Sequence, residues 1–383
     1  MARIVHFGKY YFPDAGGIES VTASLARGAS AAGHSVSVVC FQKTSTQNEE
    51  IIEGVRVIRA PIAVMVASQP LGLNYFLQCV HVAKGADVVH LHVPNMLGAL
   101  CALFVNRKIR LLVHWHSDVI NKGFLGKVLS PLESTLLRRA DCIVATSQAY
   151  ADASETLAPF RNKITIVPIG VPDTKYEGTA SVLPPFIRER IKEKKIILSV
   201  GRLVPYKGFN ILIEGAKHLL ADSVVVIVGS GPLQQDLQQA IDTAGVSDRV
   251  LMAGRLSDAT LHALFEQAVL YCLPSTYRAE AFGVVLLEAM AYGLPVVATN
   301  IPGSGVPWVN QHGTTGLNVP VGDSEALAKT CNQILGSTEL QSRLSRGARQ
   351  RFLTEFTEEI SVKRMMATYD RLVATCSADR IAL

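Results

Sequence analysis

Two glutamates eight positions apart, Glu280 and Glu288, enclose the run Ala-Phe-Gly-Val-Val-Leu-Leu. The run follows a strand-like stretch and a Pro-Ser turn, and it predicts the first turns of a helix that ends near Gly293. Eight residues of helix place both carboxylates on one face, about 12 Å apart along the axis. Gly283 lets a ligand approach the backbone N–H groups of a helix N-terminus, which favour an anion. Acid, anion cradle and acid suit a sugar, a diphosphate and a ribose in a row; the alternative is an amphipathic helix with two solvated glutamates.

A pair of cations stands on a short loop after another predicted strand. The apolar run Ile196 to Val200 leads into Gly201-Arg202, and Lys207-Gly208 follows before a helix that opens at Phe209. Ligands of open α/β sheets bind outside the carboxyl ends of the strands. Arg202 and Lys207 are therefore expected at the ligand, although a lone surface lysine would be ordinary. An arginine that closes an apolar strand is costly unless it is paired.

Three further turns follow predicted strands. Gly16-Gly17 precedes a helix near Ile18 and allows a tight turn with close ligand approach, or is a plain strand-to-helix turn. Gly254-Arg255 stands at another strand end. The run Val-Gly-Ser-Gly-Pro from Val228 resembles a phosphate loop, but Gln234 stands where a third glycine would be, so a nicotinamide-binding fingerprint is excluded.

Strand-like runs alternate with helical patterns along the chain, which predicts parallel α/β units. The strands are expected near 3–7, 36–40, 55–60, 87–92, 110–116, 142–147, 164–170, 195–201, 223–229, 249–254, 269–273, 295–299 and 316–319. A stretch rich in Pro, Gly and Thr from Pro168 to Pro185 is the expected hinge. The chain of 383 residues is long enough for two domains of ordinary size.

The Arg…Lys-Gly pair, the Glu280/Glu288 pair with its Phe-Gly interior and the Gly-Gly turn together resemble glycosyltransferase family 4. The resemblance covers essentially the whole chain. It implies the GT-B fold, in which two Rossmann-like domains face each other across a cleft. The N-terminal acceptor domain would span 1–172, the nucleotide-sugar donor domain 173–357, and the last helix, about 358–383, would cross back onto the first domain.

The resemblance also implies an activity and a role for each matched residue. The enzyme would be a retaining transferase that moves a hexose from a nucleotide diphosphate sugar to a carbohydrate or lipid-linked acceptor. Front-face substitution needs no protein nucleophile, so the protein supplies positioning and charge. Arg202 and Lys207 would neutralise the diphosphate, Glu280 would accept hydrogen bonds from the sugar, and Glu288 would hold the ribose. The other implied contacts to the donor are those of Gly16, Gly17, Gly254, Arg255, Phe282, Gly283, Val284 and Val285.

Two histidine pairs, His90-x-His92 and His114-x-His116, end predicted strands, and alternation puts each pair on one face. A metal site must be considered, but no acidic or cysteine ligand accompanies the histidines at a typical spacing. The family uses no metal to activate its donor, so no metal and no other cofactor are expected. The run His116-Ser117-Asp118 matches the family's histidine–acid segment, which implies that His116 contacts the donor sugar. Packing is the expectation for His90 and His114.

One segment departs from the family pattern. Many members carry Pro-Glu in the turn after the strand that follows the glutamate helix, whereas this chain has Val306-Pro307-Trp308. A tryptophan cannot accept a hydrogen bond from a hydroxyl group. This departure weakens an assignment of the donor by analogy.

Composition and charge narrow the compartment and the partners. Seven scattered cysteines without a C-x-x-C pair predict buried free thiols in the cytoplasm, and the chain shows no signal peptide and no spanning segment. The window 101–139 holds seven cations and two acids, overlaid on apolar residues at helical spacing. This pattern predicts peripheral contact of 122–139 with the inner face of a cytoplasmic membrane, or else a helix that packs on the core. No nucleic-acid motif is present, so nucleic acid is not expected as a partner.

Two other classes of protein stay open. One is a nucleotide-sugar epimerase or another non-transferring enzyme on the same fold, and the other is a two-domain sugar-binding protein. General similarity favours GDP-mannose or a UDP-hexose as donor, for a bacterial surface polysaccharide. The sequence does not name the base, the sugar or the acceptor.

Overall fold

The chain divides into two α/β units, each with its own sheet. The computed structural model describes residues 1–14, 16–43, 45, 47–66, 69–118, 123–173 and 183–381, without the side chains of 123–129 and 375–381. Unit 1 consists of Met1–Gly170 together with Glu358–Leu383, and unit 2 is Val171–Thr357. The division falls at Gly170, two residues before the predicted boundary, and residues 174–182 of the expected hinge lie outside the described residues.

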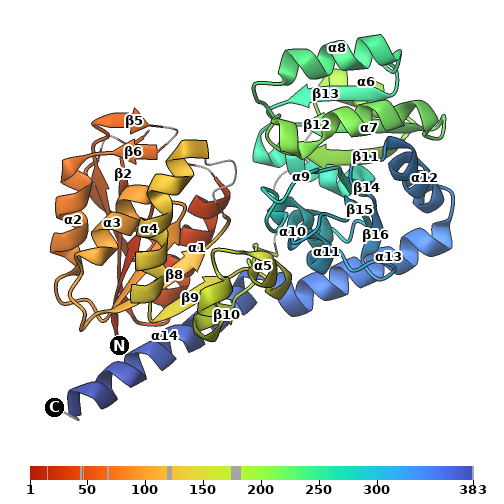
Figure 1. Ribbon diagram of the computed structural model, residues 1–383. Coiled ribbons are helices and arrows are strands. Elements are labelled where there is room, and N and C mark those ends of the chain that lie inside the picture. Colours follow the sequence, from red (N-terminus) through yellow and green to blue (C-terminus); the bar gives the residue numbers. More distant parts are fainter. Residues whose placement is uncertain are drawn as a thin grey trace. The chain divides into compact units, whose positions relative to one another are not determined.

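Unit 1 is built on an eight-stranded sheet in the order β10-β9-β8-β7-β1-β2-β4-β3 (Figure 1). The strands are β1 (Arg3–Phe7), β2 (Ser35–Phe41), β3 (Glu49–Ile52), β4 (Val55–Ala60), β7 (Val88–Val93), β8 (Arg110–Trp115), β9 (Cys142–Ala145) and β10 (Ile164–Ile166). All neighbours pair in parallel except β3, which runs antiparallel to β4, and a separate hairpin joins β5 (Val64–Val66) to β6 (Gln69–Leu71). The sequence patterns did not predict β3, β5 or β6.

Helices cover both faces of this sheet. They are α1 (Gly17–Ala31), α2 (Leu73–Ala83), α3 (Met96–Leu103), α4 (Gly123–Arg139), α5 (Gln148–Ala153), η1 (Ala158–Lys163) and α14 (Glu358–Ile381). Alternation along β7 sends Leu91 toward α3 and His90 toward Tyr369 of α14, so the C-terminal helix packs on the face opposite α3. The last helix therefore belongs to the first unit, as the family resemblance implied.

Unit 2 has six parallel strands in the order β13-β12-β11-β14-β15-β16. They are β11 (Lys195–Val200), β12 (Ser223–Val228), β13 (Val250–Gly254), β14 (Ala268–Leu273), β15 (Val296–Thr299) and β16 (Gly316–Val319). The helical segments are α6 (Pro185–Ile191), η2 (Pro205–Lys207), α7 (Phe209–Gly215), η3 (Ala216–His218), α8 (Gln234–Ala244), α9 (Asp258–Gln267), α10 (Val284–Ala291), α11 (Val306–Val309), α12 (Ser324–Leu335), α13 (Thr338–Arg351) and η4 (Phe352–Phe356). Every strand of both sheets that the sequence predicted is present.

The strand order sets where a ligand can lie in each unit. In unit 2 the order turns back between β11 and β14, and in unit 1 between β1 and β7. At such a switch point the loops that leave two adjacent strands diverge to opposite faces, and a crevice opens at the carboxyl ends. The loops after β11 and β14 carry Arg202, Lys207 and Glu280, so the predicted site coincides with the switch point of unit 2.

Candidate active site

Lys207 and Glu280 form a buried ion pair at the switch point of unit 2. The Lys207 Nζ atom lies 2.6 Å from Glu280 Oε2, and each side chain is only 10% exposed. The loop after β11 sets the lysine in place, since Gly208 has φ +67° and a Cβ there would lie 2.1 Å from the Pro274 carbonyl oxygen. The close passage of the two loops therefore requires a glycine. Arg202, on the same loop, is exposed to solvent.

The prediction that Glu280 and Glu288 share one helix is wrong. The helix α10 begins at Val284, after Gly283 with φ +78°, so Glu280 lies in the preceding turn. A left-handed residue interrupts helical geometry, and the glycine that was expected to admit a ligand also stops the helix. Glu280 is positioned by side chains instead: Ser275 Oγ donates to its Oε2 at 3.0 Å, and Ser304 Oγ donates to its carbonyl oxygen.

The first turn of α10 offers free backbone donors beside this pair. The N–H groups of Val284 and Val285 stand where a helix has no internal acceptor for them. Their amides and the positive end of the helix dipole favour an anion. A diphosphate would also gain the charges of Lys207 and Arg202.

Glu288 is half-buried on the second turn of α10. Burial raises the pKa of its carboxyl to about 7, and the charge of Asp258 adds to the rise, while Lys207 opposes it. A carboxyl with this pKa exchanges its proton near neutral pH. It accepts two hydrogen bonds when ionised, which matches the two adjacent hydroxyls of a ribose.

Phe282 fills the core instead of facing a ligand. Its ring is buried and lies 6.1 Å from both Trp308 and Phe356 between ring centroids. The guanidinium of Arg351 lies 4.9 Å from the centre of the Trp308 ring. The tryptophan that replaces the family's acidic residue is thus part of an aromatic cluster directly behind the Glu280 turn.

Gly254 and Arg255 lie at the end of β13, where the family contacts the base. Gly254 has φ +69°, its carbonyl oxygen accepts from the Gly229 N–H at 2.9 Å, and the Arg255 side chain is exposed. A Cβ on Gly229 would lie 1.9 Å from the Gly201 carbonyl oxygen. In the loop after β12, which resembles a phosphate loop in sequence, the first glycine is therefore needed for close packing against the loop after β11.

In unit 1 the Gly16-Gly17 turn begins α1, as predicted. A Cβ on Gly16 would lie 2.1 Å from Glu19 Oε2, so the Glu19 carboxylate bends back to the start of its own helix. Burial raises the pKa of this carboxyl, and the charges of Lys9 and Lys43 oppose the rise. An acid at this helix end disfavours a phosphate there and suits a ligand hydroxyl.

The two histidine pairs share one buried face of the unit 1 sheet, as alternation predicted. His6 on β1 and Tyr369 on α14 join them, and neither was singled out in the sequence, because 363 residues separate the two. Burial lowers the pKa of His6 and of His116 to about 3. Burial and the neighbouring imidazoles lower the pKa of His90, His92 and His114, so these rings are neutral at neutral pH.

The basic stretch is only partly free to meet a membrane. Lys122 lies outside the described residues, and the Lys127 side chain is not described. Arg139 donates to Asp141 at 3.1 Å and to the Ile109 carbonyl at 2.9 Å, and Leu136 and Leu137 are fully buried. The second half of α4 thus packs on the core of unit 1. Among the described residues, no helix combines the length and apolar composition that crossing a bilayer requires.

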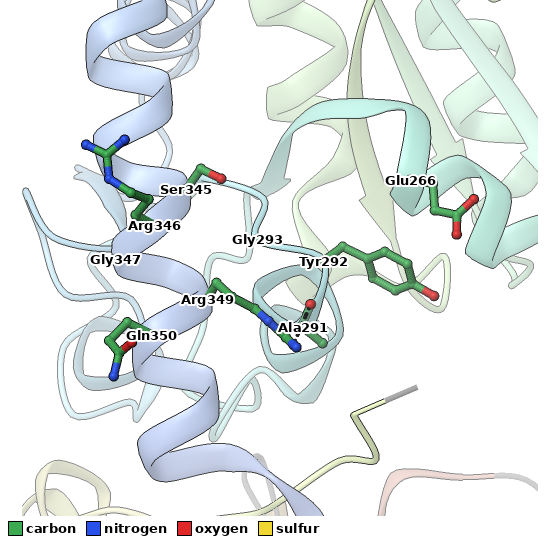
Figure 2. A pocket seen from close by; sticks show the side chains of 9 residues that line it. All are labelled: Glu266, Ala291, Tyr292, Gly293, Ser345, Arg346, Gly347, Arg349 and Gln350. Carbon is green, nitrogen blue, oxygen red and sulfur yellow. Dashed lines mark hydrogen bonds between the residues drawn. The ribbon is translucent and has the colours of Figure 1, made fainter. Parts of the chain in front are cut away.

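A surface depression of about 960 Å³ lies elsewhere on unit 2, past the C-terminal end of α10 (Figure 2). Its residues include Tyr292, Gly293 and Arg349. The Arg349 guanidinium donates to the Ala291 carbonyl at 2.8 Å and to Asp173 at 2.6 Å. Arg349, one of two arginines that line this depression, therefore links α13 to the end of α10 and to Asp173, and none of the lining residues belongs to the Lys207–Glu280 pair.

Six described cysteines are free and buried, as expected: Cys40, Cys79, Cys101, Cys142, Cys272 and Cys331. The contacts that sequence reasoning missed in the site are Ser275, Ser304 and the Lys207–Glu280 pairing itself. Ser275 lies two residues after β14, in the Pro-Ser turn, so its position near a strand end was the one signal that could have found it.

Known proteins match both units. Residues 185–351 match the family described as "Glycosyl transferases group 1", and residues 16–170 match the "Glycosyl transferase 4-like domain". The O-antigen chain mannosyltransferase C of Escherichia coli is 30% identical over 98% of this chain and 100% of its own length. The D-rhamnosyltransferase WbpZ of Pseudomonas aeruginosa is 32% identical over 93% of this chain and 92% of its own.

Solved structures show the same fold. Sucrose-phosphate synthase of Thermosynechococcus elongatus has a TM-score of 0.79 at 21% identity, over 98% of this chain and 100% of its own. HepE of Anabaena, solved with UDP and glucose, has a TM-score of 0.77 at 19% identity, over 97% and 100%. These relatives do not favour an epimerase or a binding protein. The chain belongs to the group 1 glycosyl transferases, has the GT-B fold, and moves a hexose from a nucleotide sugar to an acceptor.

Proposed function

We propose that the enzyme is a retaining hexosyltransferase whose donor is GDP-mannose or a UDP-hexose, and that it extends a lipid-linked bacterial surface polysaccharide. The observation that carries the proposal is the buried Lys207–Glu280 pair at the switch point of unit 2, beside the N-terminus of α10. It joins a cation, an acid and backbone donors, the three groups that a diphosphate and a sugar require.

The diphosphate would be held by charge and by backbone amides. Lys207 and Arg202 would neutralise the leaving phosphate, and the N–H groups of Val284 and Val285 would donate to its oxygens. Such preorganised donors stabilise the charge that develops as the sugar–phosphate bond breaks. Because the cations and the helix N-terminus already supply this stabilisation, we propose that the enzyme needs no metal ion and no other cofactor.

The two glutamates would orient the two ends of the donor. Glu280 would accept hydrogen bonds from the sugar hydroxyls, while its Oε2 pairs with the Lys207 ammonium. Glu288, ionised, would accept from the ribose diol, which links nucleotide affinity to a group with a pKa of about 7. The roles of Gly254 and Arg255 toward the base, and of Gly16, Gly17 and His116 toward the sugar, stay predictions from the family resemblance.

The acceptor proposal rests on two of the relatives, an O-antigen chain mannosyltransferase and a D-rhamnosyltransferase. Such chains are hydrophobic at the lipid end, so we propose a location in the cytoplasm at the inner face of the membrane. The surface best suited to that contact is apolar: Leu73, Leu77, Leu100 and Phe104 of α2 and α3 are exposed. Phe76 and Phe104 lie 5.2 Å apart between ring centroids, which ties the two helices together, and the exposed Arg107 and Lys108 follow α3.

Because of this apolar surface, we propose that α2 and α3 contact the membrane in place of the predicted segment 122–139. Aromatic and aliphatic side chains enter the interface, and adjacent cations gain about 1 kcal/mol each from an anionic leaflet. In the described part of α4, the buried leucines leave only the basic side for such contact.

Nucleotide identity is tested first by thermal shift of the protein with GDP, UDP, ADP and dTDP. We expect stabilisation by GDP or UDP in the absence of divalent metal, and loss of that stabilisation in Glu288→Ala. Tyr292→Phe, which changes the depression in Figure 2, is the matched control and should bind like the parent. Equal shifts with all four nucleotides, or none, would contradict the proposed donor class.

A further inference from the structure

Five histidines and one tyrosine form a continuous hydrogen-bonded chain beneath α14. In the first row, His6 Nδ1 lies 3.0 Å from His92 Nε2, and His92 Nδ1 lies 3.0 Å from His116 Nε2. In the second row, His90 Nε2 lies 3.3 Å from His114 Nδ1. Tyr369 joins the rows, since its hydroxyl lies 2.6 Å from His90 Nδ1 and 3.4 Å from His6 Nε2.

The rings form two stacked layers. Along the rows the planes of bonded imidazoles differ by only 18°, 14° and 9°. Between the rows, His90 stacks on His92 at 4.2 Å and His114 stacks on His116 at 4.1 Å, measured between centroids. Since an imidazole lone pair lies in the ring plane, each one points along its row toward the next ring.

This arrangement suits hydrogen bonds better than a metal ion. Two histidine triads bring ring nitrogens within 4.8 Å of one another, which on distance alone would allow a cation. A tetrahedral ion needs three lone pairs that converge on one point. The bonded rings within each row are nearly parallel and, although His6 is tilted by 37° from His90, their lone pairs point along the rows, so the nitrogens meet one another in pairs instead.

The connections run head to tail. From His114 to His116, every imidazole uses Nδ1 toward the next member and Nε2 toward the previous one. A neutral imidazole has one donor nitrogen and one acceptor nitrogen, and a hydroxyl can donate once while it accepts. If one ring carries its proton on Nδ1, its neighbour must do the same for each bond to have one proton. All five rings therefore share one tautomer.

The buried end of the chain selects which tautomer it is. His114 Nε2 is buried and has no hydrogen-bond partner in the described part of the molecule. With Nε2–H throughout, the chain would bury an N–H without an acceptor at His114; with Nδ1–H throughout, it leaves a bare nitrogen there. Buried N–H groups without acceptors are the rarer of the two in backbones, and we apply the same preference here. Reversal would require a proton to enter at this buried nitrogen and another to leave at His116 Nδ1.

We propose that this chain holds His116 as a neutral Nδ1–H donor toward a hydrogen-bond acceptor of the ligand, and that Tyr369 is the positioning residue that ties the two rows into one unit. The lowered pKa of all five histidines agrees with the neutral state that the argument requires. Identification of the acceptor as an oxygen of the donor sugar rests on the proposed function. The chain itself does not.

The chain is tested by ¹⁵N spectra of histidine-labelled protein without ligand, which distinguish bare from protonated ring nitrogens. We expect protonated Nδ1 at all five positions. Tyr369→Phe removes the hydroxyl that joins the two rows. In the second row one ring proton then has no acceptor, whether it lies on His90 Nδ1 or on His114 Nε2. Those two rings should become tautomer mixtures, while His6, His92 and His116 keep Nδ1–H.

Tyr75→Phe is the matched control. The Tyr75 hydroxyl is equally buried in unit 1 and makes two hydrogen bonds, to the Gly8 carbonyl and to Asn95, outside the chain. We expect a comparable loss of thermal stability and five unchanged histidine tautomers. Mixed tautomers among the five in the parent, or a second row that stays uniform in Tyr369→Phe, would overturn the chain.

The use of His116 is tested by two substitutions with opposite losses. His116→Asn keeps an N–H donor near the Nδ1 position and loses the link to His92, whereas His116→Gln keeps a polar group near Nε2 and loses the outward donor. Donor hydrolysis should be about tenfold faster in the Asn variant than in the Gln variant, the scale of one hydrogen bond. Equal rates, or a faster Gln variant, would overturn the donor role of Nδ1. The ¹⁵N experiment needs no nucleotide sugar, so failure of the hydrogen-bonded chain and failure of the proposed function are distinguishable.

Discussion

Removal of the Lys207 charge should cost stability as well as activity, because the lysine and Glu280 are buried together. Each side chain is 10% exposed, and their charged atoms are 2.6 Å apart. Loss of one partner of a buried pair costs about 3–5 kcal/mol, since the remaining charge keeps its desolvation penalty. In Lys207→Met, Glu280 would retain the Ser275 hydroxyl, whose hydrogen bond to a charged group is worth roughly 1.5–3 kcal/mol. We therefore expect a loss at the lower end, about 3 kcal/mol.

The double variant separates the structural role from the catalytic one. Lys207→Met with Glu280→Gln removes both charges and leaves an amide of nearly the same volume, which can still accept from Ser275. The double variant should lose about 2 kcal/mol less stability than the summed losses of Lys207→Met and Glu280→Gln, as expected of coupled neighbours. Donor hydrolysis should remain slower than in the parent by about 10²–10³, because the stabilising charge is gone.

The assay is urea unfolding read by hydrogen exchange in peptides from β11 and β14, so that unit 2 is observed by itself. Ser223→Ala is a control. The Ser223 hydroxyl, at the start of β12 in the same sheet, donates to the Leu220 carbonyl and touches neither charge. Strict additivity of the two single variants would refute the reasoning, because a buried pair in contact must couple. Full activity of the double variant would refute the role of the pair in catalysis.

Three further predictions concern the donor, the metal and the membrane. Affinity for GDP or UDP should rise as the pH passes through about 7 and level off only above that, because the raised pKa of Glu288 delays its ionisation. Calorimetry of Glu288→Gln should lack this rise, while phosphate titration affects both proteins equally, and identical pH profiles would remove the ribose role. Arg202→Ala should lower turnover by roughly 10²–10³ without loss of stability, since its side chain is exposed. The parent enzyme should stay active in a chelator. Inactivation by the chelator would show that cations of the protein are not the main partners of the diphosphate. Leu77→Ser with Phe104→Ser should weaken binding to anionic vesicles, whereas Ile51→Ser, at a still more exposed residue on β3, should not. Equal binding by all three proteins would exclude the apolar surface of α2 and α3.

Periodicity predicted the sheets because their central strands are buried on both faces. The run from Ser223 to Val228 is wholly buried and rich in valine, so burial and β propensity indicate the same element. Strand β3, Glu49–Ile52, was missed, since an edge strand with exposed glutamates carries no such signal. The hairpin of Val64–Val66 and Gln69–Leu71 is short and contains a proline, which also reads as a loop.

The site was predicted by residue type but not by geometry. Arg202 was singled out because a charge that closes an apolar strand is costly unless it is paired, Lys207 because it stands on the same loop, and Glu280 because of its spacing from Glu288. That Lys207 pairs with Glu280 could not be read from the sequence, because the two loops meet through parallel strands 73 positions apart. A glycine such as Gly283 can allow close approach of a ligand or mark the start of a helix. Its left-handed conformation shows that it stands at the start of α10. The spacing revealed four of the six members of the histidine chain, and the packing of β1 and α14 added His6 and Tyr369.

The most direct test of the central claim is the fate of the sugar when the enzyme hydrolyses its donor without an acceptor. GDP-mannose and UDP-glucose, both α-linked, would be incubated with the parent and with Lys207→Met in the presence of a chelator, and the released sugar followed by ¹H NMR before it mutarotates. The account predicts release of the α anomer with one of the two nucleotides, and release slower by about 10²–10³ in the variant. Initial release of the β anomer, or unchanged release by Lys207→Met, would contradict it.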